Sequence, residues 1–511
     1  MRLSLIGGSD YRRSIIANAQ RCINLFPELN RKDSPVSMTL YQRPGLRPLA
    51  QGVVAPVRGL YRASNGNGYC VIGQNVYSIG ANWALTQLGT LSVYGTNPVS
   101  MIDNGNAAGQ LFLVDGSPVG YQILLANNAF SQIVDGTGTF LGATRVDYID
   151  TFFIWAPAGG GPGSGTNQWG STLSNSLTFD ALYTAGKTDY PDPIVTLIVN
   201  RHEIILAGQL KSEIWYNAGN AQFPFSELPG AYIEHGIVAP YSIASEDINA
   251  YWLGQDLQGH GIVFQQRGYD TKRISNHALE YAIEQIVAAV GQTITDAIGY
   301  TWQQGGHVYY SLNFPSGNQT WVYDASVGDP TLAWHQEAWT DANGMLNRHR
   351  GNCCAFINGK NVVGDWQNGT IYEMDRNVYT DTLVPDGPAG PISFIRGFPH
   401  IFELGGPNGP ISLDGKLLQF NQFRLDIESG MGPLESDGTP AKVGLRWSDD
   451  RGKTFKNAVL QSNGAPGEYI TQPKWPGTGE ARDRIFEVSY SIAGPAALQG
   501  AWVDAKMLAG T

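Results

Sequence analysis

The chain has few cysteines and little charge for its length. Only four of its 511 residues are cysteines, and only 15% are Asp, Glu, Lys or Arg. Two of the four are adjacent, at Cys353 and Cys354, and a bridge between neighbours is strained, so no disulfide framework is expected. Synthesis in a reducing compartment is the simpler interpretation. Low charge is also typical of surfaces that become buried in an assembly.

Long apolar runs are missing as well. The start "MRLSLIGGSDYRRS" has only a short apolar stretch before polar residues, which does not predict a signal peptide. Stretches such as "HEIILAGQL" (202–210) are far shorter than the roughly 20 residues that span a bilayer. No membrane-spanning segment is therefore expected.

The few charges are unevenly placed. Residues 1–62 hold ten basic and three acidic side chains, a net of +7, whereas the remaining residues hold 23 basic and 41 acidic ones, a net of −18. We interpret residues 1–62 as a basic N-terminal arm with lead-in strands. Its candidate docking residues are Arg12, Arg13, Arg31 and Lys32. The acidic remainder argues against tight wrapping of nucleic acid, which requires clustered cations.

An apolar strand, a polar turn and a second strand with an aromatic residue recur along the chain. With 63 glycines and 24 tyrosines, the composition suits an all-β protein with many tight turns. Repeats of 40–50 residues built from hairpins are typical of β-propeller blades. We therefore predict a propeller-like domain over residues 63–380 with six or seven blades, since an N-terminal strand can complete the last one. The seven hairpins are 69–80, 111–124, 152–182, 203–219, 250–266, 307–325 and 361–375.

The repeating hairpin pattern is interrupted at two places. Residues 275–290 predict a short helix that is capped by Ser275 or Asn276. Residues 381–391, dense in Pro and Gly, predict a linker. Period-two alternation then predicts a C-terminal antiparallel β-sandwich over residues 392–511.

The stretch "WSDDRGKTF" (447–455) is similar to the Asp-box of sialidases and other propeller glycosidases. Glycine tolerates positive φ, and Asp and Ser side chains accept backbone hydrogen bonds around a turn, so the box needs no substrate to explain it. It occurs once, outside the expected propeller. We interpret it as a structural turn that is formed by Ser448, Asp450, Gly452, Thr454 and Phe455.

No local pattern indicates catalysis, a cofactor or a metal. The eight histidines are scattered singly, and neither zinc-ligand spacing nor a nucleophile elbow occurs. No arginine or carboxylate spacing identifies a glycosidase centre. We therefore expect no enzyme, although a propeller glycosidase and a carbohydrate-binding fibre or adhesin subunit both stay open as alternatives.

Whole phrases carry a family resemblance. The ordered set begins with "RCINLFPELN" (21–30) and "LYQRPGL" (40–46), continues through "RGYDTKRISNHALEYAIEQ" (267–285), and ends with "LRWSDDRGKTF" (445–455) and "GTGEARDRIFEVSYS" (477–491). The chain resembles the packaged-DNA stabilisation proteins of short-tailed bacteriophages, also called tail hubs or nozzles. The resemblance covers nearly the whole sequence.

The resemblance implies a structural role in the virion, in the phage tail, after synthesis in the host cytoplasm. Such hubs form homohexameric rings below the head-to-tail adaptor, prolong the DNA channel and retain the packaged genome. They anchor a tail needle, spikes or fibres, and double-stranded DNA passes through them without sequence-specific binding. The family has no catalytic residues to carry over, and an acidic lumen would let DNA slide.

Overall fold

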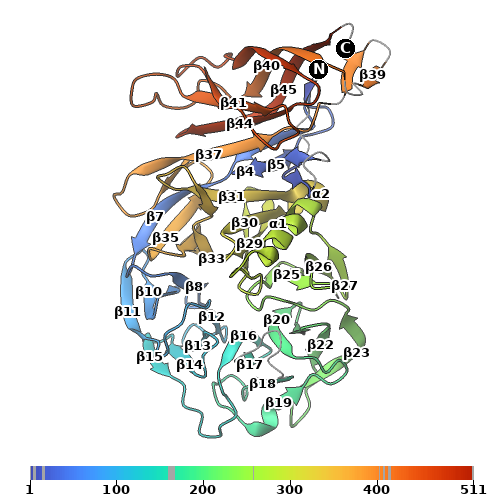
Figure 1. The fold of residues 1–511 in the computed structure, drawn as a ribbon. Coiled ribbons are helices and arrows are strands. Elements are labelled where there is room, and N and C mark those ends of the chain that lie inside the picture. The colour runs from blue at the N-terminus through green and yellow to red at the C-terminus, as the bar shows by residue number, and fades with distance from the viewer. Residues whose placement is uncertain are drawn as a thin grey trace.

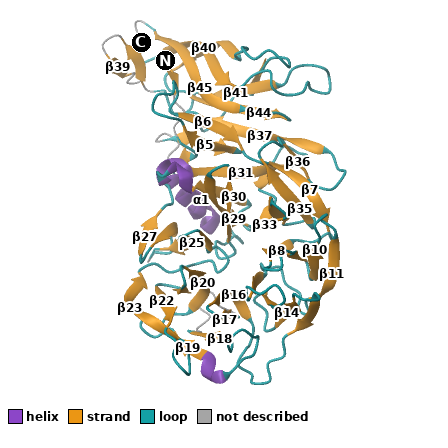
Figure 2. Ribbon diagram, turned by 180° about the vertical axis from the view of Figure 1, so that it is seen from behind, coloured by secondary structure: helices purple, strands orange, loops and turns teal. Residues whose placement is uncertain are grey.

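The computed structural model describes residues 2–3, 7–13, 18–158, 167–256, 258–401, 403–406, 409–412 and 416–508. Figure 1 shows two parts, a ring of small sheets and, at one side of the ring, a second body of longer strands that holds both chain ends. Strands dominate in both parts, as Figure 2 shows. The all-β prediction is confirmed.

Seven four-stranded antiparallel sheets form the ring in the described part of the chain. Each is a blade whose inner strand comes first in the sequence, except that blade 7 takes its outer strand from the N-terminal region. The first three blades are β8 (Val57–Arg62), β9 (Gly68–Ile72), β10 (Asn75–Ile79) and β11 (Leu85–Thr90); β12 (Ser100–Asp103), β13 (Gln110–Val114), β14 (Gly120–Leu124) and β15 (Ala129–Gln132); and β16 (Ala143–Ile149), β17 (Phe152–Pro157), β18 (Gln168–Ser171) and β19 (Thr184–Gly186).

The other four blades complete the ring. They are β20 (Ile194–Asn200), β21 (Glu203–Gly208), β22 (Ser212–Asn217) and β23 (Phe225–Ile233); β24 (Ala244–Glu246), β25 (Asn249–Gln255), β26 (Gly261–Arg267) and β27 (Asp270–Arg273); β28 (Ile298–Gln304), β29 (His307–Phe314), β30 (Gln319–Asp324) and β31 (Trp334–Thr340); and β33 (Gly351–Ile357), β34 (Lys360–Asp365), β35 (Thr370–Asp375) and β7 (Gly45–Gln51).

The seven hairpins expected from the sequence are the two middle strands of the seven blades. The propeller prediction is therefore confirmed, and the blade count is seven. Strand β7 pairs antiparallel with β35, so an N-terminal strand closes the last blade, and the next strand, β8, starts the first. Closing the ring in this way joins the two ends of the propeller by backbone hydrogen bonds.

The helix predicted over residues 275–290 is α1 (His277–Ala288), and its N-cap is Asn276, whose side chain accepts from the backbone N–H of Leu279. The apolar residues Ala278, Ile283 and Ile286 are buried against blades 5 and 6. Val290, the last residue of the predicted range, lies beyond the helix and is fully exposed. A second helix, α2 (Pro330–Ala333), precedes β31.

Two antiparallel sheets beyond the propeller share one hydrophobic core, the arrangement expected of a sandwich. Phe420 and Phe423 of one sheet meet Phe486 of the other at ring-centroid distances of 5.8 and 4.8 Å. One sheet contains β43 (Lys474–Ala481), β40 (Leu418–Ile427), β45 (Ala497–Met507), β6 (Met38–Gln42), β5 (Leu25–Leu29) and β1 (Arg2–Leu3), and the other contains β37 (Ala389–Gly397), β44 (Ile485–Ile492), β41 (Lys442–Ser448) and β42 (Val459–Ser462).

The structure places the expected N-terminal arm inside both folded parts. Strands β1, β5 and β6 complete a sheet of the sandwich, whereas β7 and β8 belong to the propeller. The expected linker is also partly strand, because β36 (Thr380–Thr382) and the start of β37 fall within or beside residues 381–391. Strand pairing with partners hundreds of residues away explains the difference, since a local pattern reveals a strand but not its neighbour.

The sandwich and the propeller are continuous through backbone pairing. Strand β4 (Cys22–Ile23) pairs with β31 at the outer edge of blade 6 and with β37 of the sandwich. Strand β36 pairs with β7 at the outer edge of blade 7 and with β37. The second body therefore bridges two neighbouring blades, at the seam where the ring closes.

We predict that residues 392–511 alone do not fold. The core of the sandwich includes Leu25, Met38 and Leu40, which are at most 3% exposed and come from the N-terminal strands. Losing three buried side chains of this size costs about 2–5 kcal/mol each, which is comparable with the whole stability of a domain. The isolated fragment should lack near-ultraviolet circular dichroism and a cooperative melt. A sharp melt of this fragment would show that the N-terminal strands are dispensable.

Candidate functional site

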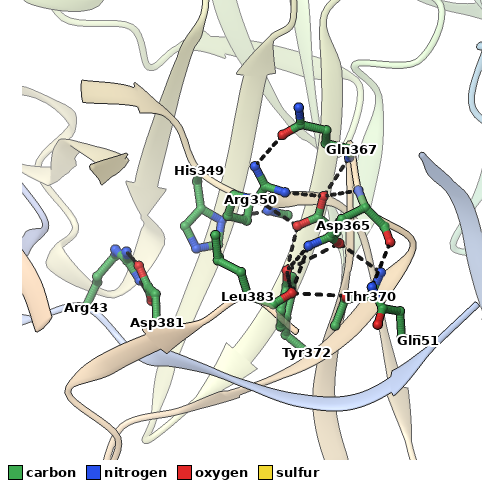
Figure 3. Close-up of polar contacts among 12 residues, drawn as sticks. Arg43, Gln51, His349, Arg350, Asp365, Gln367, Thr370, Tyr372, Asp381 and Leu383 are labelled. Carbon is green, nitrogen blue, oxygen red and sulfur yellow. Dashed lines mark hydrogen bonds and ion pairs between the residues drawn. The ribbon is translucent and has the colours of Figure 1, made fainter. Parts of the chain in front are cut away.

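A buried arginine joins the propeller to the sandwich. Arg43 lies between β6 and β7 and is 1% exposed. Its Nη1 and Nη2 donate to the two carboxylate oxygens of Asp381 at 3.1 and 2.5 Å, and Nη2 also donates to the carbonyl of Ala338 at 3.2 Å. Ala338 lies on the outer strand of blade 6 and Asp381 on β36. The Arg43 guanidinium therefore contacts both β31 of blade 6 and β36, which pairs with the closing strand β7; Figure 3 shows its ion pair with Asp381.

Asn24 adds a third contact at the same place. Its Oδ1 accepts from Nε of Arg43 at 2.9 Å and from the backbone N–H of Ala338 at 2.8 Å, and its Nδ2 donates to the carbonyl of Ser393 on β37 at 2.7 Å. Asn24 has φ 59°, a conformation that Asn tolerates better than most residues. We call Asn24, Arg43 and Asp381 the junction triad.

A second buried ion pair holds the chain where it leaves blade 7. Nε and Nη2 of Arg350 each donate to Asp365 at 2.7 Å. The Tyr372 hydroxyl lies 2.6 Å from the same carboxylate and 2.9 Å from the carbonyl of Leu383, which follows β36 (Figure 3). Bidentate arginine–carboxylate geometry of this kind is strong and directional. It fixes the loop that leads into the sandwich.

Two titratable groups are buried beside the junction triad. Oε2 of Glu337 lies 4.0 Å from Nε2 of His349, and neither residue is more than 5% exposed. Burial raises the pKa of Glu337 to about 7, although the charge of Arg43 acts against the shift. Burial, with Arg43 and Arg350, holds the pKa of His349 well below its usual value. The seam thus favours the neutral form of both groups.

Sequence reasoning did not single out the junction triad. Asn24 and Arg43 lie within two of the phrases that carry the family resemblance, "RCINLFPELN" and "LYQRPGL". Membership in those two phrases was therefore the only feature of the sequence that could have drawn attention to Asn24 and Arg43. Arg43 and Asp381 are separated by 338 positions, so no local pattern could pair them.

The four basic candidate residues are all exposed, and they lie in two places. Arg12 and Arg13 line a cavity of about 630 Å³ beside α1, where Arg13 forms an ion pair with Glu284. Arg31 and Lys32 lie in the turn between β5 and β6 of the sandwich. The structure does not gather them into a single basic patch.

The Asp-box residues form a hydrogen-bonded turn. Oγ of the buried Ser448 donates to Oδ1 of Asp450 and accepts from the N–H of Gly452, both at 2.7 Å. The N–H and hydroxyl of Thr454 donate to Asp450 at 2.9 and 2.5 Å. These bonds, led by the Thr454 hydroxyl, lower the pKa of Asp450 to about 2. Gly452 has φ 86°, as the turn requires.

The turn packs beside the propeller. Phe455 is half-buried, with the guanidinium of Arg446 4.7 Å from its ring centroid. Gly452 and Phe455 line a cavity of about 410 Å³ together with Tyr11, Arg21 and residues of β31. The box therefore lies at the border between the sandwich and blade 6.

The described residues contain neither a metal-binding cluster nor a membrane-spanning helix. No group of three or more His, Cys, Asp or Glu side chains is placed so that it could hold a metal ion. None of the helices combines the length and the apolar character needed to cross a membrane.

The architecture defines a class of protein, a seven-bladed β-propeller whose ring is closed by an N-terminal strand and clasped by a second all-β body. Residues 1–379 match the model of the phage stabilisation family described as "Bacteriophage P22 Gp10, beta-propeller", and the chain belongs to this family. It is thus a structural tail protein of a phage. The match covers the propeller and the N-terminal strands.

Solved structures with a similar fold are distant. The WD40 domain of Neurospora crassa Pan2 has 8% identity and a TM-score of 0.41, over 65% of this chain and 96% of that one. YCF48 from Cyanidioschyzon merolae has 9% identity and a TM-score of 0.40, over 65% and 99%. No curated protein matches the chain.

We predict that Arg43→Met lowers the free energy of unfolding by about 3–5 kcal/mol, because it leaves Asp381 buried without its counter-ion. Arg47→Met is the matched control. Arg47 also contacts carboxylates, those of Glu373 and Asp375, but its side chain is 48% exposed, so its loss should cost about 1 kcal/mol or less. Urea unfolding measures both. Equal losses in the two variants would contradict a special role for the junction triad.

The Asp-box turn generates a prediction with a pH dependence. The lowered pKa of Asp450 means that its charged form stabilises the fold above the unfolded value of about 3.9, and that this contribution disappears as the pH falls through about 2. Asp450→Asn should therefore lower the melting temperature at pH 6 and lose that effect progressively below pH 4.

Two glycine variants are the controls for the turn. Gly452→Val should cost about 1–3 kcal/mol at every pH, because φ 86° strains a β-branched residue. Gly136→Val, at an exposed glycine with open space around it and no positive φ, should leave stability unchanged. An Asp450→Asn variant that melts like the parent at pH 6 would refute the structural interpretation of the box.

Proposed function

We propose that the protein is the tail hub, or nozzle, of a short-tailed phage. It forms a homohexameric ring below the head-to-tail adaptor, extends the DNA channel, retains the packaged genome and anchors a needle, spikes or fibres. The observation that carries the proposal is the family match over residues 1–379, in a chain whose matched region is a closed propeller.

The interior of the propeller supports a channel between subunits rather than through one subunit. Arg145, on the inner strand of blade 3, donates to the carbonyl of Ile243 just before blade 5, at 2.8 Å. The backbone of blade 6 also approaches Ser242, because a Cβ at Gly299 would lie 2.0 Å from the Ser242 carbonyl oxygen. These contacts, between blades 3 and 5 and between the neighbouring blades 5 and 6, narrow the centre of the propeller, so DNA would pass along the axis of the assembled ring instead.

Charge supports passage without tight binding. The chain carries a net charge of −11, and the excess of acid lies beyond residue 62. A lumen with this sign repels phosphates and lets DNA slide, whereas retention would come from the ring and its appendage.

The tryptophans give little support to carbohydrate stacking. All thirteen tryptophans lie in the described residues, and each is buried or half-buried. Sugar-binding surfaces usually present aromatic rings to solvent, and the two most exposed rings here, Tyr94 (79%) and Tyr469 (67%), lie in different parts of the molecule, the propeller and the sandwich. The family match is therefore the observation that favours the hub.

We predict that reversing the charge of the candidate docking residues weakens binding to the adaptor. Deleting the N-terminus is unsuitable as a test, because it removes strands β1, β4 and β5. The test variant changes Arg12, Arg13, Arg31 and Lys32 to Glu, since all four are exposed. The control variant changes four other exposed basic residues to Glu, namely Arg62, Arg201, Lys272 and Lys453. Its net charge therefore changes by the same amount as that of the test variant.

Both variants should melt like the parent, because exposed substitutions usually change stability by less than about 0.5 kcal/mol. In mass photometry of mixtures with the adaptor, the control should form the same ring complex as the parent, and the test variant should lose it at moderate salt. Undiminished binding of the test variant would refute the docking assignment. Failure of the parent itself to bind the adaptor would refute the hub.

A further inference from the structure

A cavity of about 550 Å³ lies at the face of the propeller where the inner strands begin. Its lining comes from blades 1, 2, 3, 5, 6 and 7, and includes Pro56 before β8, Thr144 in β16, Tyr241 before β24, Ile298 in β28 and Asn352 in β33. Because so many blades contribute the starts of their inner strands, the cavity lies on the propeller axis. We call it the axial pocket.

Arg348 lines the axial pocket with unused hydrogen-bond donors. Its residue is 8% exposed, and its guanidinium lies 4.5 Å from the ring centroid of Trp366. Nη1 reaches Oδ1 of Asn352 at 3.5 Å, a long contact, and Nε and Nη2 meet no acceptor among the described residues. These donors face the axial pocket, where a ligand can reach them.

The other arginines that form buried ion pairs show the contrast. Arg43, Arg58 and Arg350 each reach a carboxylate at 2.9 Å or less, whereas within the described residues no carboxylate lies within 4.0 Å of Arg348. Trp366, against which Arg348 stacks, also lies 4.9 Å from the guanidinium of Arg350. The Arg348 side chain therefore stacks on Trp366 with no carboxylate in direct contact, and Asp296 is the carboxylate whose charge acts on it most strongly.

The surroundings favour a ligand with no more than one negative charge, because the Asp296 carboxylate acts on the same guanidinium. Asp296 also lines the pocket, and its Oδ2 accepts from the backbone N–H of Ser316 at 2.9 Å. Its charge would disfavour a phosphate dianion but tolerate a single carboxylate on Arg348. Four prolines and Tyr241 supply rigid, largely apolar walls that suit a compact body.

We propose that the axial pocket binds a monocarboxylate, held by bidentate hydrogen bonds from Arg348, with its body against Tyr241 and the prolines. Planar guanidinium and carboxylate groups match in this geometry. Burial lowers the pKa of Arg348 to about 10, so the side chain stays charged at neutral pH. The carboxylate is the terminal group of a small acid or the side chain of an inserted acidic residue.

Titrations followed by NMR test the site with four probes, namely benzoate, glucuronate, N-acetyl-aspartamide and inorganic phosphate. At least one of the three carboxylates should bind saturably at a single site with a Kd of about 1 mM or below. Tighter binding of benzoate or glucuronate indicates a small acid, and tighter binding of N-acetyl-aspartamide indicates a side chain. Phosphate should bind more weakly than the best carboxylate.

Variants assign the binding to the pocket. Arg348→Met should weaken it at least about ten-fold, and Arg62→Met, at an exposed arginine, should not. Asp296→Asn should strengthen carboxylate binding and allow phosphate to bind, an outcome that a purely structural role for Arg348 would not produce. If Arg348→Met fails to fold, Arg348→Lys keeps the charge, loses the bidentate geometry and should still bind more weakly.

Absence of saturable binding for all three carboxylates would overturn the proposal, and so would equal affinity in the parent and the folded Arg348 variant. The test uses the full chain without the adaptor, so its result is independent of the hub.

Discussion

The ion pair between Arg43 and Asp381 is the contact on which the architecture depends. A propeller must close its ring, and here the closing strand, β7, follows Arg43 directly. The same guanidinium reaches the outer strand of blade 6 and, through Asn24, the sandwich. The same buried side chain, Arg43, therefore stabilises both the closure of the ring and the attachment of the second body. Breaking a buried pair of this kind costs far more than losing a surface one.

This constraint explains why the two bodies share their strands. The N-terminal segment crosses from the sandwich to blade 7 and then to blade 1, so neither body is completed by a continuous stretch of chain. A protein built in this way transmits force between its parts through backbone pairing and buried charges. The family-matched propeller and the second body are therefore one continuous structural unit.

Much of the fold was predictable from the sequence, because blades repeat locally. Each of the seven hairpins pairs strands separated by a few residues, and the alternation of apolar and polar positions marks them. The N-cap Asn276 and the turn around Gly452 were likewise visible in local residue types. The placement of β1, β5 and β6, and the roles of Asn24, Arg43, Asp381 and Arg348, were not predictable. They depend on partners far away in the sequence, and a single arginine in a list of residues does not reveal whether it has a counter-ion.

The most direct test of the account is the position of this chain in the virion. Gold-labelled antibody against the sandwich should mark the tail at the vertex below the head in every particle, and particles assembled without the chain should package DNA and then lose it. Label on the tips of fibres, or particles that retain their genome without the chain, would contradict the assignment as a hub.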